Sequence, residues 1–146
     1  MTLTRAKYLL GSVERRRKMI DVRSLMIGDW VMHNDTPKKV ITNLADSVAL
    51  ENTDYGLAYE RVRGEQMEPI PLTDEILAKN FALTKHGYQV CNCWKIWANP
   101  NYGYILATLV MDEFGGGSYE PCLPCRYAHE LQQFLRLKHE EKEVVI

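Results

Sequence analysis

Short apolar runs follow one another along the first half of the chain, separated by residues that favour turns. The runs are 29–33, 39–44, 48–52 and 58–62. The segments between them include Asn34-Asp35-Thr36-Pro37 and Asn52-Thr53-Asp54-Tyr55-Gly56. Short runs at intervals of about 8–12 residues are typical of several antiparallel strands, since a two-stranded piece is not stable alone. The pattern therefore predicts a small, SH3-like β-barrel or meander over residues 19–70.

The next segment predicts the end of this half and the start of a short helix. Met67-Glu68-Pro69-Ile70-Pro71-Leu72 is expected to be extended, because a residue that precedes proline avoids the α region. Thr73 is a favourable N-cap, and the two acidic residues after it suit the positive end of the helix dipole. The sequence thus predicts a helix over Asp74–Asn80, at the start of a second unit over residues 71–146.

Three apolar segments of this second unit predict an antiparallel β-hairpin sheet. Tyr88–Trp97 alternates as one strand would, with one face made by Tyr88, Val90, Trp94 and Ile96 and the other by Cys91, Cys93 and Trp97. Tyr104–Met111 is nearly all apolar, which predicts a central strand covered on both faces. Tyr119–Cys125 contains Pro121 and Pro124, which confine it to an edge of the sheet. Three glycines, Gly115–Gly117, predict the loop before it.

Residues Tyr127–Lys138 have the periodicity of an amphipathic helix. The expected core stripe consists of Tyr127, Ala128, Leu131, Phe134 and Leu135. The expected solvent face consists of His129, Gln132, Gln133 and Arg136. Glu143–Ile146 either adds a short strand or docks as a tail. Together the elements predict an α+β protein: a small β-barrel or meander, a short helix, a hairpin sheet and a C-terminal helix packed on that sheet.

Composition places the chain among ordinary globular proteins. It has 146 residues, of which 46% are hydrophobic and 25% charged. No run approaches the roughly 18 consecutive apolar residues of a membrane span, and the first ten residues do not have the pattern of a signal peptide. We therefore expect a cytoplasmic protein with no membrane partner. In that reducing compartment, free thiols or metal ligands are the expected states of the four cysteines, in preference to disulfides.

The charge is divided unevenly along the chain. Residues 1–18 contain six basic residues and one acidic residue, whereas the remainder contains 12 basic and 18 acidic residues. The arginine run Arg15-Arg16-Arg17 could belong to a nucleic-acid-binding or partner-binding arm, or to a solvated helix end. We favour a third interpretation, in which Met19 is the native start and residues 1–18 are a translated leader, because a purine-rich ribosome-binding site read in frame encodes arginine. A nucleic-acid partner is expected only if residues 1–18 are native, since an acidic body repels phosphate.

The cysteines form two close pairs, Cys91 with Cys93 and Cys122 with Cys125. Four thiolates on a hairpin could hold a tetrahedral Zn²⁺, although a C-x-C spacing is unusual for zinc. The leading interpretation has no cofactor, with Cys91 and Cys93 as small apolar residues that pack under a helix. A redox role for the second pair is less favoured, because that pair does not open a helix after a strand.

No set of residues has the spacing of a known catalytic motif. His129-Glu130 would need a second histidine where Gln133 stands. We therefore expect that the chain is not an enzyme. Trp97, Tyr102 and Tyr104 near a hairpin end are candidates for a binding surface, because aromatic side chains there can stack on bases or anchor a partner. Closing the end of a core is the commoner role of such residues.

Three segments together resemble a group of small uncharacterised proteins encoded by phages and mobile elements of gut bacteria. These segments are Ile27-Gly28-Asp29-Trp30-Val31, Glu68-Pro69-Ile70-Pro71-Leu72-Thr73-Asp74-Glu75-Ile76-Leu77 and Tyr127-Ala128-His129-Glu130-Leu131-Gln132. The resemblance spans most of residues 22–146, implies the Met19 start and leaves the four cysteines outside its pattern. The group has no established activity, so the resemblance implies a phage or mobile-element setting and no catalytic residues.

These observations predict a non-enzymatic accessory binding protein that acts as an adaptor or inhibitor of a protein partner. An acidic body and strand edges open to pairing favour this function. One alternative is a small-ligand protein that binds or sequesters a nucleotide between the two halves of the chain. Another is an interaction module stabilised by zinc.

Overall fold

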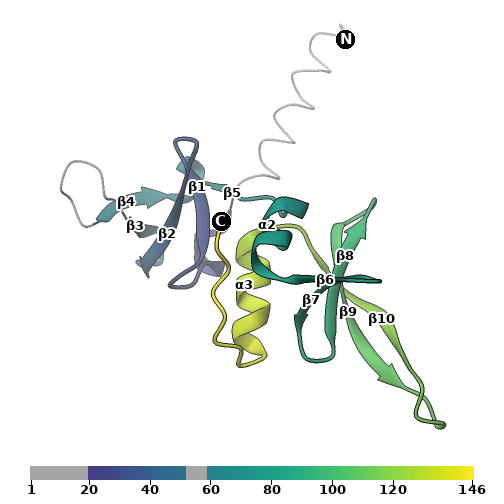
Figure 1. The fold of residues 1–146 in the computed structure, drawn as a ribbon. Helices are drawn as coiled ribbons and strands as arrows, with labels where there is room; N and C mark the ends of the chain where they lie inside the picture. The colour runs from purple at the N-terminus through teal and green to yellow at the C-terminus, as the bar shows by residue number, and fades with distance from the viewer. Residues whose placement is uncertain (1–19, 52–58) are drawn as a thin grey trace, which may run out of the picture. The chain divides into compact units, whose positions relative to one another are not determined.

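The computed structural model describes residues 20–51 and 59–146. The basic leader 1–18, the proposed start at Met19 and the whole of the turn predicted at 52–56 lie outside these ranges. The chain divides between Ile70 and Pro71 into two compact units, and each unit is described by itself. Both units contain antiparallel sheets, and the second adds two α-helices, so the predicted α+β class is confirmed (Figure 1).

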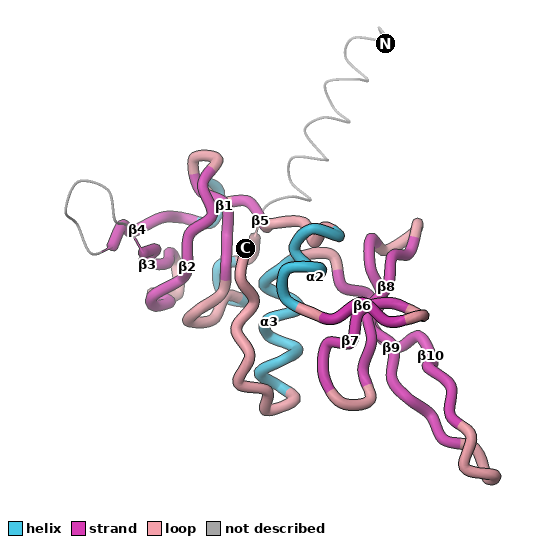
Figure 2. Tube along the Cα trace, in the orientation of Figure 1, coloured by secondary structure: helices cyan, strands magenta, loops and turns pink. Residues whose placement is uncertain are grey.

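The first unit is a five-stranded antiparallel sheet with the strand order β4-β3-β2-β1-β5. Its strands are β1 Trp30–His33, β2 Thr36–Asn43, β3 Ser47–Glu51, β4 Tyr59–Arg63 and β5 Glu68–Pro69, with the 3-10 turns η1 Val22–Ser24 and η3 Gly64–Gln66. β1 to β4 form the predicted meander (Figure 2). Among the described residues no pairing joins β4 to β5, so the sheet stays open and the closed barrel is not confirmed.

The turn between β1 and β2 is shorter than the predicted four-residue segment. Asn34 and Asp35 have φ angles of 50° and 59°, whereas Thr36 and Pro37 already belong to β2. Two consecutive residues with positive φ match the twist of the flanking strands, so pairing begins at once with His33 opposite Thr36.

The core of the first unit lies between this sheet and the segment before β1. Its buried members are Ile20, Val22, Leu25, Val31, Val40, Val48, Leu50, Val62 and Met67. The side-chain amide of Asn43 donates to the carbonyls of Val22 and Leu25 at 2.7 and 2.9 Å. These bonds satisfy two carbonyls that strand pairing does not reach, and so they fix residues 22–25 against the meander.

The second unit is a five-stranded antiparallel sheet, ordered β10-β9-β8-β7-β6, with two helices. Its elements are α2 Asp74–Asn80, β6 Ala82–Thr84, β7 Gly87–Cys91, β8 Trp94–Asn99, β9 Gly103–Met111, β10 Gly117–Cys125 and α3 Ala128–Leu137. α2 has the predicted bounds, and the Thr73 hydroxyl accepts from the Ile76 amide at 3.2 Å, as an N-cap should. β10 is the predicted edge strand, with an irregularity between Pro121 and Leu123.

The prediction of one strand over Tyr88–Trp97 is wrong. The segment is a hairpin, in which β7 and β8 pair and Cys91 lies opposite Trp94. Cys93 makes the turn with a φ of 63°. Tyr88 and Ile96 nevertheless lie opposite each other and share a face, because a register shift between Gln89 and Cys91 offsets the odd spacing of Cys91 and Trp94. The alternation therefore stays in phase across the turn and does not reveal it.

The two helices cover one face of this sheet. Trp94 meets the ring of Phe134 from α3 edge-on, with 4.9 Å between the ring centroids. The Tyr104 hydroxyl donates to a carboxylate oxygen of Asp74 in α2 at 2.7 Å. Ile96 and Leu106, which pair across β8 and β9, are buried on the same face. This face holds the core of the second unit.

The stripe predicted on α3 is buried at Ala128, Leu131, Phe134 and Leu135, whereas the predicted solvent face is wrong at two positions. His129 and Gln132 are buried, and Gln132 is only 2% exposed. The Val144 amide donates to the Gln132 side-chain oxygen at 2.6 Å, and the Gln132 amide donates to the Lys142 carbonyl at 3.2 Å. The last residues therefore dock as a tail that covers this side of α3.

Candidate functional site

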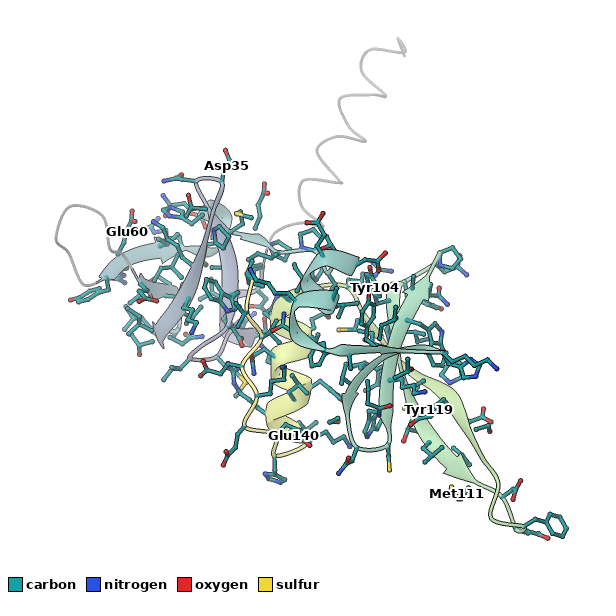
Figure 3. All side chains as sticks on the ribbon, in the orientation of Figure 1. Asp35, Glu60, Tyr104, Met111, Tyr119 and Glu140 are labelled. Atoms are coloured by element: carbon teal, nitrogen blue, oxygen red, sulfur yellow. The ribbon has the colours of Figure 1, made fainter. Side chains whose placement is uncertain are left out.

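The outer half of the β9–β10 hairpin is uncovered, in contrast to its inner half. Leu106 and Ala107 near the start of β9 are buried, whereas Val110 and Met111 at its end are exposed and Phe114 in the turn is 94% exposed. Figure 1 shows the two strands running out past α2 and α3, and Figure 3 shows Met111 on the outer part. The prediction of a β9 covered on both faces is therefore wrong for its last residues. Residues 110–117 are called the hairpin tip below.

The turn of the hairpin tip is held by its own hydrogen bonds. One carboxylate oxygen of Asp112 accepts from the amides of Phe114 and Gly116, each at 2.8 Å. The Asp112 amide donates to the Gly116 carbonyl at 2.7 Å. Gly115 has a φ of +81°, which favours glycine, and a Cβ on Gly116 would lie 2.7 Å from the Asp112 carboxylate. The glycine run thus forms a specific turn that presents Phe114 to solvent.

The hairpin tip is apolar at its centre and negatively charged around it. Between residues 103 and 125 the chain has three acidic residues, Asp112, Glu113 and Glu120, and no lysine or arginine. Val110, Met111 and Phe114 are the exposed large apolar side chains of the tip. This combination is complementary to an apolar pocket with a basic rim.

The three aromatic residues predicted as a binding surface do not lie together. Tyr104 is on the helix-covered face, where burial and the bond to Asp74 raise the pKa of its phenol. Tyr102 is exposed in the β8–β9 turn, which is held by the Asn99 side chain accepting from the amides of residues 101 and 102. Trp97 alternates onto the opposite face of the sheet from Ile96. Of the three, Trp97 lines a cavity to which neither Tyr102 nor Tyr104 contributes.

That cavity has a volume of about 600 Å³ and lies within the second unit. It is lined by His86, Trp97, Gly117, Ser118 and Tyr119. The ammonium of Lys95 lies 4.4 Å from the centroid of the Tyr119 ring. Trp97 is half-buried, and the side chains of Trp97 and Tyr119 give the cavity two aromatic walls. This cavity is called the sheet pocket below.

The four cysteines are not brought together, so they do not form the proposed zinc site. Cys125 lies opposite Tyr104, whereas the carbonyl of Cys93 accepts from Leu109, five residues further along β9. At roughly 3.3 Å per residue of strand these cysteines are about 16 Å apart. No group of three or more His, Cys, Asp or Glu in residues 20–51 and 59–146 could hold a metal ion.

The thiols differ instead in their surroundings. Burial raises the pKa of Cys125, with Glu130 adding to the effect. Burial also raises the pKa of Cys91, and the nearby Glu140 acts in the same direction. Cys93 and Cys122 are exposed, so the prediction of a buried Cys93 is wrong, because this residue makes the β7–β8 turn. A raised pKa disfavours the thiolate, which is the reactive form, so Cys125 has the environment of a core residue and not of a nucleophile.

Sequence reasoning missed Phe114, Tyr119 and His86. The sequence signal for Phe114 is a large aromatic residue between acidic residues and glycines, in Asp112-Glu113-Phe114-Gly115. Such a segment is expected to be a loop, and a loop offers an aromatic side chain no core in which to be buried. Tyr119 and His86 carried no such signal, because their place at the sheet pocket depends on which strands become neighbours.

Comparisons of the chain with protein-family models, with curated proteins and with solved structures find no match. Across the described ranges, no helix is both long and apolar enough to cross a bilayer. Function is therefore inferred from the contacts, exposure and charge of this chain. Two features carry that inference: the hairpin tip and the sheet pocket.

Proposed function

We propose that the protein is a non-enzymatic accessory binding protein that acts as an adaptor or inhibitor of a protein partner in the cytoplasm, and that the hairpin tip is its contact surface. The proposal includes the phage or mobile-element setting that the sequence resemblance implies. It assigns binding to the chain and no reaction. The observation that carries it is the 94% exposed Phe114 on a turn locked by Asp112.

Exposure of Phe114 brings no benefit to folding. Burying a phenylalanine side chain is worth about 1.5–3 kcal/mol, which this residue does not gain within its own unit. Aromatic residues in fully desolvated pockets are frequent hot spots of protein interfaces. Because the turn is already hydrogen-bonded, a partner that buries Phe114 has little loop ordering to oppose binding.

The negative charge at the hairpin tip indicates which kind of partner would bind it. Asp112 and Glu113 lie in the hairpin tip and Glu120 three residues beyond it, and the chain has no lysine or arginine between residues 103 and 125. A partner with an apolar pocket and a lysine or arginine rim would gain both apolar burial and electrostatic steering. We expect its association to be slower at about 0.5 M salt than at about 0.05 M salt, because salt screens exposed charges.

We also propose that the first unit is an SH3-like fold. Two features support this: β5 returns to the side of β1, and η3 forms the connection from β4. A register shift in β2 between Val40 and Thr42 would allow the sheet to bend across itself. Side-chain NOEs that link the two halves of the bent sheet across a common core would support this assignment, and a flat sheet would contradict it.

Site-specific photo-crosslinking tests the contact surface. A photoreactive phenylalanine analogue replaces Phe114 in cells that naturally carry the gene, and in a control variant it replaces Leu137, which is 75% exposed at the end of α3. We expect one discrete protein adduct from position 114 and not from position 137. Excess unlabelled protein should compete the adduct away, whereas the Phe114→Ala variant should not.

Two results would contradict the proposal. One is the same set of adducts from positions 114 and 137, which would indicate unspecific contact. The other is equal competition by the Phe114→Ala variant and the unchanged protein, which would show that the phenyl ring is not recognised.

A further inference from the structure

The sheet pocket offers a second binding function that does not use Phe114, although Gly117 of the hairpin tip is part of its wall. Its walls come from three separate places: the β6–β7 turn at His86, β8 at Trp97, and the start of β10 at Tyr119. It is therefore a product of the folded sheet. Its volume of about 600 Å³ is within the range of roughly 300–1,000 Å³ that small-ligand sites have.

Glycine keeps the indole of Trp97 accessible on one side. Gly87 is its neighbour on β7, and a Cβ on Gly87 would lie 3.1 Å from the Trp97 Cβ and 2.6 Å from the Ile96 carbonyl oxygen. Gly87 also has a φ of +125°, a conformation that other residues rarely adopt. The position beside Trp97 is thus held by a residue without a side chain. An aromatic wall that is open on the side of β7 favours stacking of a planar ring.

Lys95 adds positive charge at the same place. It precedes Trp97 by two residues on β8, so both side chains are on the face opposite the helices. Lys95 is only 9% exposed, and its ammonium lies 4.4 Å from the centroid of the Tyr119 ring, which lines the pocket. Among the described residues no carboxylate forms an ion pair with it. Contact with the face of an aromatic ring does not neutralise a largely desolvated ammonium, so this group favours the binding of an anion.

We infer that the sheet pocket binds a small planar aromatic molecule that carries negative charge, the chemistry of a nucleoside monophosphate. The ring stacks against Trp97, and Lys95 pairs with the anionic group. Ser118 and His86 supply hydrogen-bonding groups from the pocket wall. The second unit has seven basic and nine acidic residues between 71 and 146, so its charge does not favour a polyanion, and a free mononucleotide fits better than a nucleic-acid strand.

The test is an NMR titration of the full chain with adenosine 5′-monophosphate, adenosine and ribose 5-phosphate. We expect the monophosphate to shift the Trp97 indole and Ser118 amide signals and to leave the Trp94 indole signal, on the helix-covered face, in place. We expect it to bind at least about tenfold more tightly than adenosine, because adenosine lacks the charge that Lys95 recognises, and more tightly than ribose 5-phosphate, which lacks the ring.

A lysine pair supplies the matched control. Lys95→Met should reduce the affinity for the monophosphate to that for adenosine and leave adenosine binding unchanged. Lys138→Met should change neither, although Lys138 also lies over an aromatic ring, 4.9 Å from the centroid of Trp94. The comparison of ligands on the unchanged protein remains decisive even if a variant does not fold.

Several results would overturn the inference. The first is an absence of shifts at Trp97 and Ser118 with the monophosphate at millimolar concentration. The second is equal affinity for the monophosphate and adenosine. The third is much tighter binding of a short oligoadenylate than of the monophosphate, which would identify a single-stranded nucleic acid as the ligand.

Discussion

The two ends of the β9–β10 hairpin have similar apolar sequences and opposite environments. At the base, Leu106 packs beneath the helices and Tyr104 donates to Asp74 of α2. At the tip, Met111 and Phe114 are in solvent. The same kind of residue thus stabilises the fold at one end and is open to a partner at the other. Apolar character alone does not distinguish these roles, whereas the presence of a covering element does.

The largest expected contrast between base and tip is in stability. Leu106→Ala should lower the free energy of unfolding by about 2–5 kcal/mol, because it leaves a cavity under the helices. Phe114→Ala should change it by less than about 0.5 kcal/mol, because the side chain is exposed. Urea unfolding of both variants measures the difference. Equal losses would contradict the separation of base from tip.

A smaller loss of stability is expected when the C-terminal tail, residues 138–146, is loosened from the second unit. The Asn80 side chain in α2 donates to the Val145 carbonyl and accepts from the Val145 amide, each at 2.7 Å. Asn80→Ala should cost about 1–3 kcal/mol, because it leaves these groups without their partner. Asn80→Asp should lose at least as much in thermal unfolding, because it places a buried carboxylate oxygen against the carbonyls of Ile76 and Val145. An unchanged Asn80→Ala variant would show that the tail does not stabilise the unit.

The turn at the tip should contribute about 1 kcal/mol. Asp112→Ala removes the acceptor of the Phe114 and Gly116 amides, and a hydrogen bond of this kind is worth about 0.5–1.5 kcal/mol. Both amides should exchange with solvent faster by roughly tenfold. Glu113→Ala is the matched control, and it should leave the exchange of both amides unchanged. Similar exchange in the two variants would mean that Asp112 does not lock the turn.

The smallest effect is a pH dependence that belongs to the base. The folded-state pKa of Tyr104 is raised by burial and by Asp74, and that of Cys125 by burial. A group whose pKa is raised in the folded state stabilises the fold fully at a pH below its unfolded-state pKa, which is 9.0 for the thiol and 10.0 for the phenol. This stabilisation is lost as the pH rises from that value toward the folded-state pKa. Stability should therefore fall from about pH 9 upward. Tyr104→Phe and Cys125→Ala should each make this fall in the free energy of unfolding less steep. If the free energy fell equally steeply with pH in the variants and in the unchanged protein, the assignment would be contradicted.

Local signals in the sequence predicted those elements that local interactions determine. Thr73 and the acidic residues after it fixed the start of α2, and Pro121 and Pro124 identified the edge strand. The β7–β8 hairpin was missed because the register shift between Gln89 and Cys91 keeps the alternation in phase across the turn at Cys93. Gln132 was assigned to solvent because the tail that buries it lies ten to twelve residues away in the sequence.

The candidate sites were less predictable than the fold for the same reason. Trp97 was identified from its residue type, but its partners at the sheet pocket come from neighbouring segments that only the strand order brings near. Phe114 was overlooked because glycine runs indicate a loop and do not indicate whether that loop is ordered. In both cases the decisive property is exposure in the folded state, which depends on contacts remote in sequence.

The most direct test of the central claim measures the Phe114→Ala variant twice, for its free energy of unfolding and for its affinity for the crosslinked partner. We expect stability within about 0.5 kcal/mol of the unchanged protein and a loss of affinity of at least about tenfold, since an anchoring aromatic residue typically contributes more than 1.4 kcal/mol. Unchanged affinity, or a loss of stability large enough to explain weaker binding, would contradict the claim that this residue serves a partner and not the fold.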